Sequence, residues 1–152
     1  MATLKERIDA DLKDAMRAKD ELKLSVLRMM KSAIKYKEVE GTATVLDDAG
    51  VINVLTTLVK QRRDSVEEYT KANRADLADK ESKEIVIIQA YMPQQLSAAE
   101  LSAEVAKAIV EAGAKGPKDM GALMKVLTPK LKGRAEGKII SEEVKAQLAK
   151  LS

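Results

Sequence analysis

The sequence predicts an all-α protein, and three observations lead to this fold class. Apolar residues recur at intervals of three and four, as on one face of a helix. The apolar residues are almost all Leu, Ile, Val, Met and Ala, because the chain has no Phe, no Trp and only three Tyr. No stretch alternates apolar and polar residues as a half-buried strand does. At 152 residues, the chain can bury one core and a small second one.

The first two helices are predicted from their start signals. Thr3 and Glu6 form a capping box, and apolar residues spaced by four then predict a helix over about 3–18. Asp20 is a second N-cap candidate, and the helix that follows it should end near residue 38. Residues 41–44, Gly-Thr-Ala-Thr, are expected to form a loop.

The third and fourth helices are expected to be joined by a short turn. Asp47 or Asp48 opens the third, whose apolar positions extend for about seven turns. The chain turns near 73–74, and a fourth helix continues until Pro93. Proline lacks the amide hydrogen that a helix needs and disfavours helix in the residue before it.

Three further helices are predicted after Pro93. Ser97 and Glu100 form a second capping box, which opens a helix that ends at the glycines of 113–116. A short helix should span about 118–127 and end at Pro129. Ser141 is expected to cap the last helix after a basic loop over 130–138.

These elements predict two parts. Residues 1–94 should form an N-terminal four-helix part, as a helical bundle or paired hairpins, because long helices follow one another through short loops. Residues 95–152 should form a small three-helix C-terminal domain, near the lower size limit for independent stability.

Composition excludes several kinds of active site. The chain has no His and no Cys, so it cannot carry a Ser-His-Asp triad, a Cys nucleophile, an imidazole or thiolate zinc site, or a disulfide. We expect no cofactor and no metal. The longest aliphatic run, residues 85–88, is too short for a signal peptide or a membrane span. We therefore expect a cytoplasmic protein with no membrane partner.

Positive charge is concentrated in the C-terminal part. Residues 1–96 contain 17 basic and 17 acidic side chains, whereas residues 97–152 contain ten and seven. The segment 130–138, Lys-Leu-Lys-Gly-Arg-Ala-Glu-Gly-Lys, is typical of a phosphate-contacting loop with glycines that allow close backbone approach. The candidate RNA-binding residues are Lys118, Lys125, Lys130, Lys132, Arg134 and Lys138, and Lys115 could extend the patch. The alternative is a solvated loop between two helices.

Other charged motifs have structural interpretations. The adjacent carboxylates Asp47 and Asp48 point about 100° apart on a helix and so do not form one acid–base site. The segment 60–63, Lys-Gln-Arg-Arg, is expected to be an exposed helix face, with a second nucleic-acid contact as the alternative. Tyr91 and Met92 are expected to be core residues that pack the two parts together, with a recognition hinge as the alternative. Residues 97–152 contain no aromatic side chain, so RNA contact there should follow phosphates and shape rather than base stacking.

Two segments resemble a known family. They are residues 90–96, Ala-Tyr-Met-Pro-Gln-Gln-Leu, and residues 118–138, where Met-Gly, Lys and Gly-Arg-Ala-x-Gly-Lys follow in order. These segments resemble the YqeY-like family. The resemblance extends over essentially the whole chain and includes Val26-Leu27-Arg28 near its start. Residues 97–152 are also similar to the tail domain of the B subunit of the tRNA-dependent Asp/Glu amidotransferase.

The resemblance implies a bacterial accessory protein that binds tRNA or another RNA and is not catalytic alone. In the amidotransferase the tail domain recognises tRNA, and other domains, missing here, carry the chemistry. One alternative is a helical protein–protein interaction module that docks on a tRNA-processing or translation-related protein. Another is an accessory to carbon–nitrogen ligase activity with glutamine as the amido-nitrogen donor.

Overall fold

The computed structural model describes residues 2–41 and 45–151, and within these residues it contains seven α-helices, one short 3-10 helix and no strand. The predicted all-α fold class is therefore confirmed. The chain divides into two compact units, residues 1–92 and residues 93–152. Each unit has a hydrophobic core of its own.

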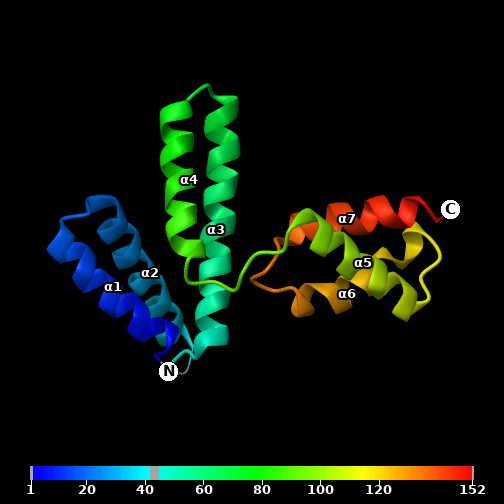
Figure 1. Ribbon diagram of the computed structural model, residues 1–152, viewed down its shortest axis with the longest axis horizontal. Helices are drawn as coiled ribbons and strands as arrows, with labels where there is room; N and C mark the ends of the chain where they lie inside the picture. Colours follow the sequence, from blue (N-terminus) through cyan, green and yellow to red (C-terminus); the bar gives the residue numbers. More distant parts are fainter. Residues whose placement is uncertain (1, 42–44, 152) are drawn as a thin grey trace. The chain divides into compact units, whose positions relative to one another are not determined.

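The N-terminal unit consists of two helical hairpins (Figure 1). Its helices are α1 (Leu4–Ala18), α2 (Glu21–Glu40), α3 (Asp48–Lys71) and α4 (Ala75–Gln89). The predicted loop at 41–44 lies outside the described residues except for Gly41. In the structure α4 ends four residues before Pro93, and Tyr91 and Met92 follow it in a turn.

Side-chain caps explain where the first three helices begin. Thr3 accepts a hydrogen bond from the amide of Glu6, Asp20 from that of Lys23, and Asp47 from the amide of residue 50. Asp48 has a different role, because its Oδ1 accepts the amide of Leu4 at 2.9 Å. Asp48 thus joins the first turn of α3 to the first turn of α1.

The N-terminal core is built from aliphatic side chains, Met30 and one aromatic ring. Tyr91 is only 4% exposed and packs in the core of the N-terminal unit. Its hydroxyl donates to Asp11 on α1, and the guanidinium of Arg7 lies 5.2 Å from the ring centroid. Burial, and next the bond to Asp11, raise the pKa of Tyr91 above its ordinary value.

The C-terminal unit is a small three-helix domain. It contains α5 (Ala98–Ala112), the 3-10 helix η1 (Pro117–Asp119), α6 (Met120–Lys130) and α7 (Gly137–Ala149). The capping box of Ser97 and Glu100 is present in both directions, as predicted. Ten buried aliphatic residues from α5, α6, α7 and Leu131 form the core.

Two helix boundaries differ from the predictions. Pro129 lies inside the last turn of α6, which continues to Lys130. Its missing amide removes one hydrogen bond from the helix, and the helix extends only one residue beyond it. The last helix begins at Gly137, and Ser141 lies within it rather than capping it. Ile140 is 1% exposed and its amide bonds to the carbonyl of Glu136, so burial of Ile140 draws the preceding residues into the helix.

Candidate nucleic-acid interface

The candidate interface is formed by α6 and the turns on either side of it. Residues 120–135 contain four basic side chains and no acidic one. Lys125 is on α6, Lys130 is its last residue, and Lys132 and Arg134 lie in the following turn. All four are exposed except Arg134, which is half-buried. Residues 120–135 themselves therefore contribute only positive charge to this part of the unit.

The acidic side chains of the unit lie mainly on the other two helices. Glu100, Glu104 and Glu111 are on α5, and Glu142 and Glu143 are on α7. Glu100 is occupied by the capping box, where the amide of Ser97 donates to it and lowers its pKa. Thus α5 is net acidic, α7 carries equal numbers of basic and acidic residues, and the segment 120–135 carries only basic ones.

The turn after α6 is held to the segment that precedes α5. The amide of Leu96 donates to the carbonyl of Arg134 at 2.9 Å, and the Gln95 side-chain amide donates to the carbonyl of Gly133 at 2.6 Å. The Nε of Arg134 donates to the carbonyl of Gln94 at 3.3 Å. The two family-resembling segments, around 94–96 and 133–134, therefore meet in space.

Local backbone geometry also fixes this turn. Leu131 is 1% exposed and anchors the turn in the C-terminal core. Gly133 has a φ of 80°, a left-handed conformation that side chains with a Cβ rarely adopt. Gly133 is thus needed for the turn itself, and Lys132 beside it is held at the surface.

The predicted residues differ in what their charges already contact. Lys130 lies 3.2 Å from Oε2 of Glu104 on α5, with side chains 45% and 33% exposed, so its charge is partly offset. The guanidinium of Arg134 donates a hydrogen bond to the carbonyl of Gln94, so Arg134 helps to hold the turn. Within the described residues, no ion pair is found for Lys125 or Lys132. These two lysines have the charges most available to phosphate.

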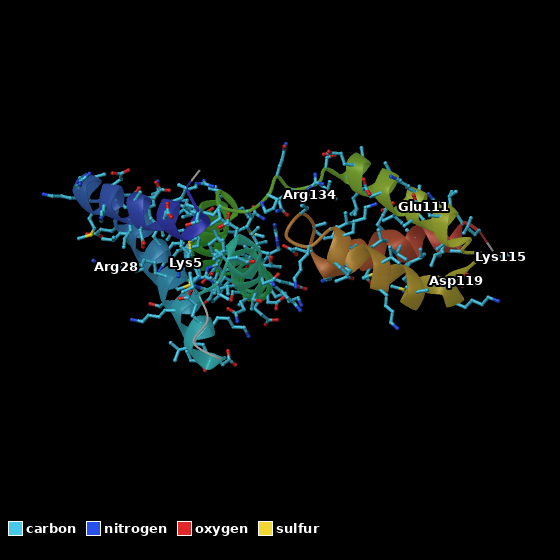
Figure 2. The ribbon with its side chains drawn as sticks, turned by 90° about the horizontal axis from the view of Figure 1, so that it is seen from below. Lys5, Arg28, Glu111, Lys115, Asp119 and Arg134 are labelled. Atoms are coloured by element: carbon cyan, nitrogen blue, oxygen red, sulfur yellow. The ribbon has the colours of Figure 1, made fainter. Side chains whose placement is uncertain are left out.

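Two of the predicted basic residues lie at the far end of α6. Figure 2 shows Lys115 and Asp119 at the opposite end of the C-terminal unit from Arg134, and Lys118 is in η1 beside Asp119. An 11-residue helix such as α6 is about 16 Å long. Lys118, Lys125 and Lys132 therefore follow the length of α6 instead of gathering at one point, and Lys138 lies in the first turn of α7.

The carboxylate of Asp119 has a structural role at that far end. Its Oδ2 accepts the amides of Lys115 at 2.8 Å and Gly116 at 3.3 Å. The hydrogen bond from the Lys115 amide is the main cause that lowers the pKa of Asp119. The carboxylate therefore organises the turn that carries Lys115 and Lys118.

Other charged residues make structural contacts, and Arg62 differs from the exposed helix face predicted for 60–63 because it packs against a neighbouring helix. Arg62, from the segment 60–63, lies against α4, where its Nε is 3.6 Å from Oε1 of Glu84 and both side chains are about 15% exposed. Asp47 and Asp48 bind separate backbone amides. The part of the chain that the structure describes contains no group of three or more acidic residues arranged to hold a metal ion.

Comparison with known proteins gives the family. The family model described as "Yqey-like protein" matches residues 5–148. This chain belongs to the YqeY-like family. The predicted family resemblance is therefore confirmed, and the YqeY-like match includes both segments that meet in the turn after α6.

Curated relatives of this YqeY-like chain include fungal proteins named "Altered inheritance of mitochondria protein 41, mitochondrial". The protein from Vanderwaltozyma polyspora is 45% identical over 82 residues, which cover 54% of this chain and 44% of the relative. The protein from Lachancea thermotolerans is 41% identical over 103 residues, covering 66% and 55%. That from Saccharomyces cerevisiae is 40% identical over 94 residues, covering 62% and 51%.

The chain spans about half the length of these relatives. The names of these relatives include the word mitochondrial, so they do not support the bacterial origin or the cytoplasmic location that we expected. In residues 2–41 and 45–151, no helix is both long and apolar enough to cross a membrane.

Proposed function

We propose that this YqeY-like chain is a tRNA-binding accessory protein that does not catalyse a reaction by itself. The observation that carries the proposal is the basic segment 120–135, which has no acidic side chain of its own and in which Lys125 and Lys132 are exposed without an ion-pair partner among the described residues. Phosphate contacts by lysine supply most of the sequence-independent affinity for nucleic acids.

Two further features support tRNA as the ligand. The C-terminal unit resembles the tail domain of a tRNA-dependent amidotransferase subunit, and residues 97–152 contain no aromatic side chain for base stacking. A folded RNA recognised by its backbone fits such a surface better than an unpaired strand does. The turn after α6 is held by hydrogen bonds and a buried leucine, so its backbone does not have to be ordered on binding.

The proposed ligand is compatible with two compartments. Both the cytoplasm and the mitochondrial interior contain tRNA, so the proposed ligand is present in either. We propose that the chain works in a tRNA-containing compartment, which for the named relatives is the mitochondrion.

The test is binding of labelled bulk tRNA to the whole chain across a salt series. The informative variant is Lys125→Ala/Lys132→Ala. Among the described residues neither lysine forms an ion pair, so their removal should not disturb the fold. The control is Lys107→Ala/Lys145→Ala, which removes two exposed lysines from α5 and α7 of the same unit. Arg134 is left unchanged because it also holds the turn.

Wild-type affinity is expected to fall steeply with salt. The slope of log affinity against log salt should become shallower by about 1.4 to 1.8 in the Lys125/Lys132 variant if each lysine meets one phosphate. The control should keep most of the wild-type slope. Absence of tRNA binding at low salt would contradict the proposal, and salt-independent binding of a protein would favour the interaction-module alternative.

A further inference from the structure

A second acid-free basic stretch lies on α2 in the N-terminal unit. Residues 22–37 contain five basic side chains and no acidic one. The charge count of residues 1–96 conceals this stretch, because Glu21, Glu38 and Glu40 at the two ends of α2 and the net acidic helix α4 balance it. The stretch is 16 residues long, as is the acid-free span of α6 and the turn that follows it.

The cations of α2 differ in their contacts. Lys31 lies 2.7 Å from Oδ1 of Asp9, and Lys37 lies 3.5 Å from Oε2 of Glu40. Arg28 and Lys35 are exposed, and the described residues show no ion pair for either. Figure 2 shows Arg28 on α2 at the edge of the N-terminal unit.

These two cations share one helical face. Positions 25, 28, 32, 35 and 39 follow the three-four spacing that places residues along one side of a helix. They are Ser25, Arg28, Ser32, Lys35 and Val39. The buried side chains of α2, at positions 26, 27, 30 and 34, lie on the other side. Glu21, four positions before Ser25, belongs to the same row and lines a shallow pocket with Arg28. The solvent face of α2 is therefore polar and free of acidic residues from Ser25 to Lys35, between Glu21 at its start and the exposed Val39 at its end.

An open groove of about 440 Å³ adjoins this face between α1 and α2. The buried side chains of Ile8 and Ile34 contribute to its lining, and Ser32 and Lys35 lie along it. Its acidic residues are occupied: Asp9 pairs with Lys31, and Oε2 of Glu38 accepts from Lys5 at 2.6 Å and from the amide of Leu46 at 2.8 Å. Because both of these carboxylates already have cationic partners, the groove does not strongly repel an anion.

An exposed aromatic ring stands near the end of the same stretch. The side chain of Tyr36 is 72% exposed, between Lys35 and Lys37 in the sequence. Of the other two tyrosines, Tyr91 is buried and Tyr69 is half-buried. Bases stack on exposed aromatic rings with little sequence preference, and flanking cations bind the adjoining phosphates.

We infer that the solvent face of α2 is a second nucleic-acid contact surface, which binds single-stranded RNA through Arg28 and Lys35 on its phosphates and Tyr36 stacked on a base. This surface differs in kind from that of α6, which has cations but no aromatic residue. An acidic peptide could satisfy the two cations, but it has no requirement for the exposed ring. The inference does not depend on tRNA binding by the C-terminal unit.

The chain contains no Trp, so the substitution Tyr36→Trp introduces a single fluorescent reporter at the proposed stacking position. We would titrate this full-length variant with single-stranded oligouridylate across a salt series and follow the tryptophan emission. Stacking on uracil should quench the emission at low salt. Tyr36→Ala in the natural chain should weaken oligouridylate binding by about fivefold or more, measured by anisotropy of a labelled oligonucleotide.

The charge contribution is tested in the chain that already carries Tyr36→Trp. Adding Arg28→Ala/Lys35→Ala should make the slope of log affinity against log salt shallower by about 1.4, the value for two phosphate contacts on a single strand. The control is Lys13→Ala/Lys80→Ala, which removes two exposed lysines from α1 and α4. It should leave the quenching curve nearly unchanged.

Three outcomes would overturn the inference. The first is an emission at position 36 that oligouridylate does not alter, even if the chain still binds tRNA through α6. The second is quenching that persists unchanged in the Arg28/Lys35 variant. The third is equal binding of polyglutamate, which would show that the surface recognises charge alone. Quenching together with failure of the Lys125/Lys132 test would support this surface and contradict only the proposal for α6.

Discussion

The side-chain amide of Gln95 donates a hydrogen bond to the carbonyl of Gly133, 38 residues later, at 2.6 Å. The same amide also reaches the carbonyl of Pro93 at 3.3 Å. The bond connects the segment that enters the C-terminal unit to the turn that carries Lys132 and Arg134. One glutamine of the Pro-Gln-Gln-Leu motif thus supports the backbone of the basic motif.

Replacing Gln95 with Ala should destabilise the C-terminal unit. The variant leaves the carbonyl of the buried residue Gly133 without this donor, and the loss should be about 1–2 kcal/mol in the free energy of unfolding. Urea unfolding followed by circular dichroism measures it. The exposed neighbour Gln94 makes its contact to Arg134 through its backbone carbonyl, so Gln94→Ala is the matched control and should change stability little. Equal effects of the two substitutions would contradict the role assigned to Gln95.

Two glycines of the basic motif should respond in opposite ways to alanine. Gly133 has a φ of 80°, so Gly133→Ala should cost roughly 1–2 kcal/mol through backbone strain. Gly137 is in the first turn of α7, and nothing lies within 4 Å of an added Cβ there. Gly137→Ala should raise stability by about 0.5–1 kcal/mol, because the unfolded chain loses conformational freedom. Thermal unfolding of both variants checks the signs, and stabilisation by Gly133→Ala would show that the turn adopts another conformation.

The hydroxyl of Tyr91 should stabilise the N-terminal unit at neutral pH. Tyr91→Phe removes its bond to the Asp11 carboxylate, which should cost about 1.5–3 kcal/mol. The folded-state pKa of Tyr91 is raised, so its contribution is fully present below the ordinary tyrosine pKa of about 10 and is lost as pH rises beyond it.

The stability difference between wild type and Tyr91→Phe should therefore close under strongly alkaline conditions. Chemical unfolding from neutral to alkaline pH measures this difference. Tyr36→Phe is the control, because the ring of Tyr36 is exposed. Loss of the Tyr36 hydroxyl should change stability little at any pH. A difference in the free energy of unfolding between wild type and Tyr91→Phe that grows with rising pH would contradict the direction of the pKa shift of Tyr91.

Much of the helical fold could be predicted because its signals are local. Thr3, Asp20 and Asp47 cap the helices that they were predicted to open, and the Ser97–Glu100 capping box forms as expected. Each of these signals depends on residues within one turn of one another, so sequence order is enough to find them. The start of α7 was predicted wrongly because burial of Ile140, a tertiary effect, outweighed the capping preference of Ser141.

Composition and order by themselves established the all-α class, the absence of histidine and cysteine chemistry, the family resemblance and the acid-free stretch of α6. Only the tertiary structure decided which basic residues remain available. It paired Lys130 with Glu104, engaged Arg134 with the carbonyl of Gln94, and left Lys125 and Lys132 exposed. It also showed that Arg28 and Lys35 on α2 stay unpaired among the described residues while Lys31 does not. The physical reason is that an ion pair or hydrogen bond depends on distances of a few ångströms between residues tens of positions apart, and only the packed helices set those distances.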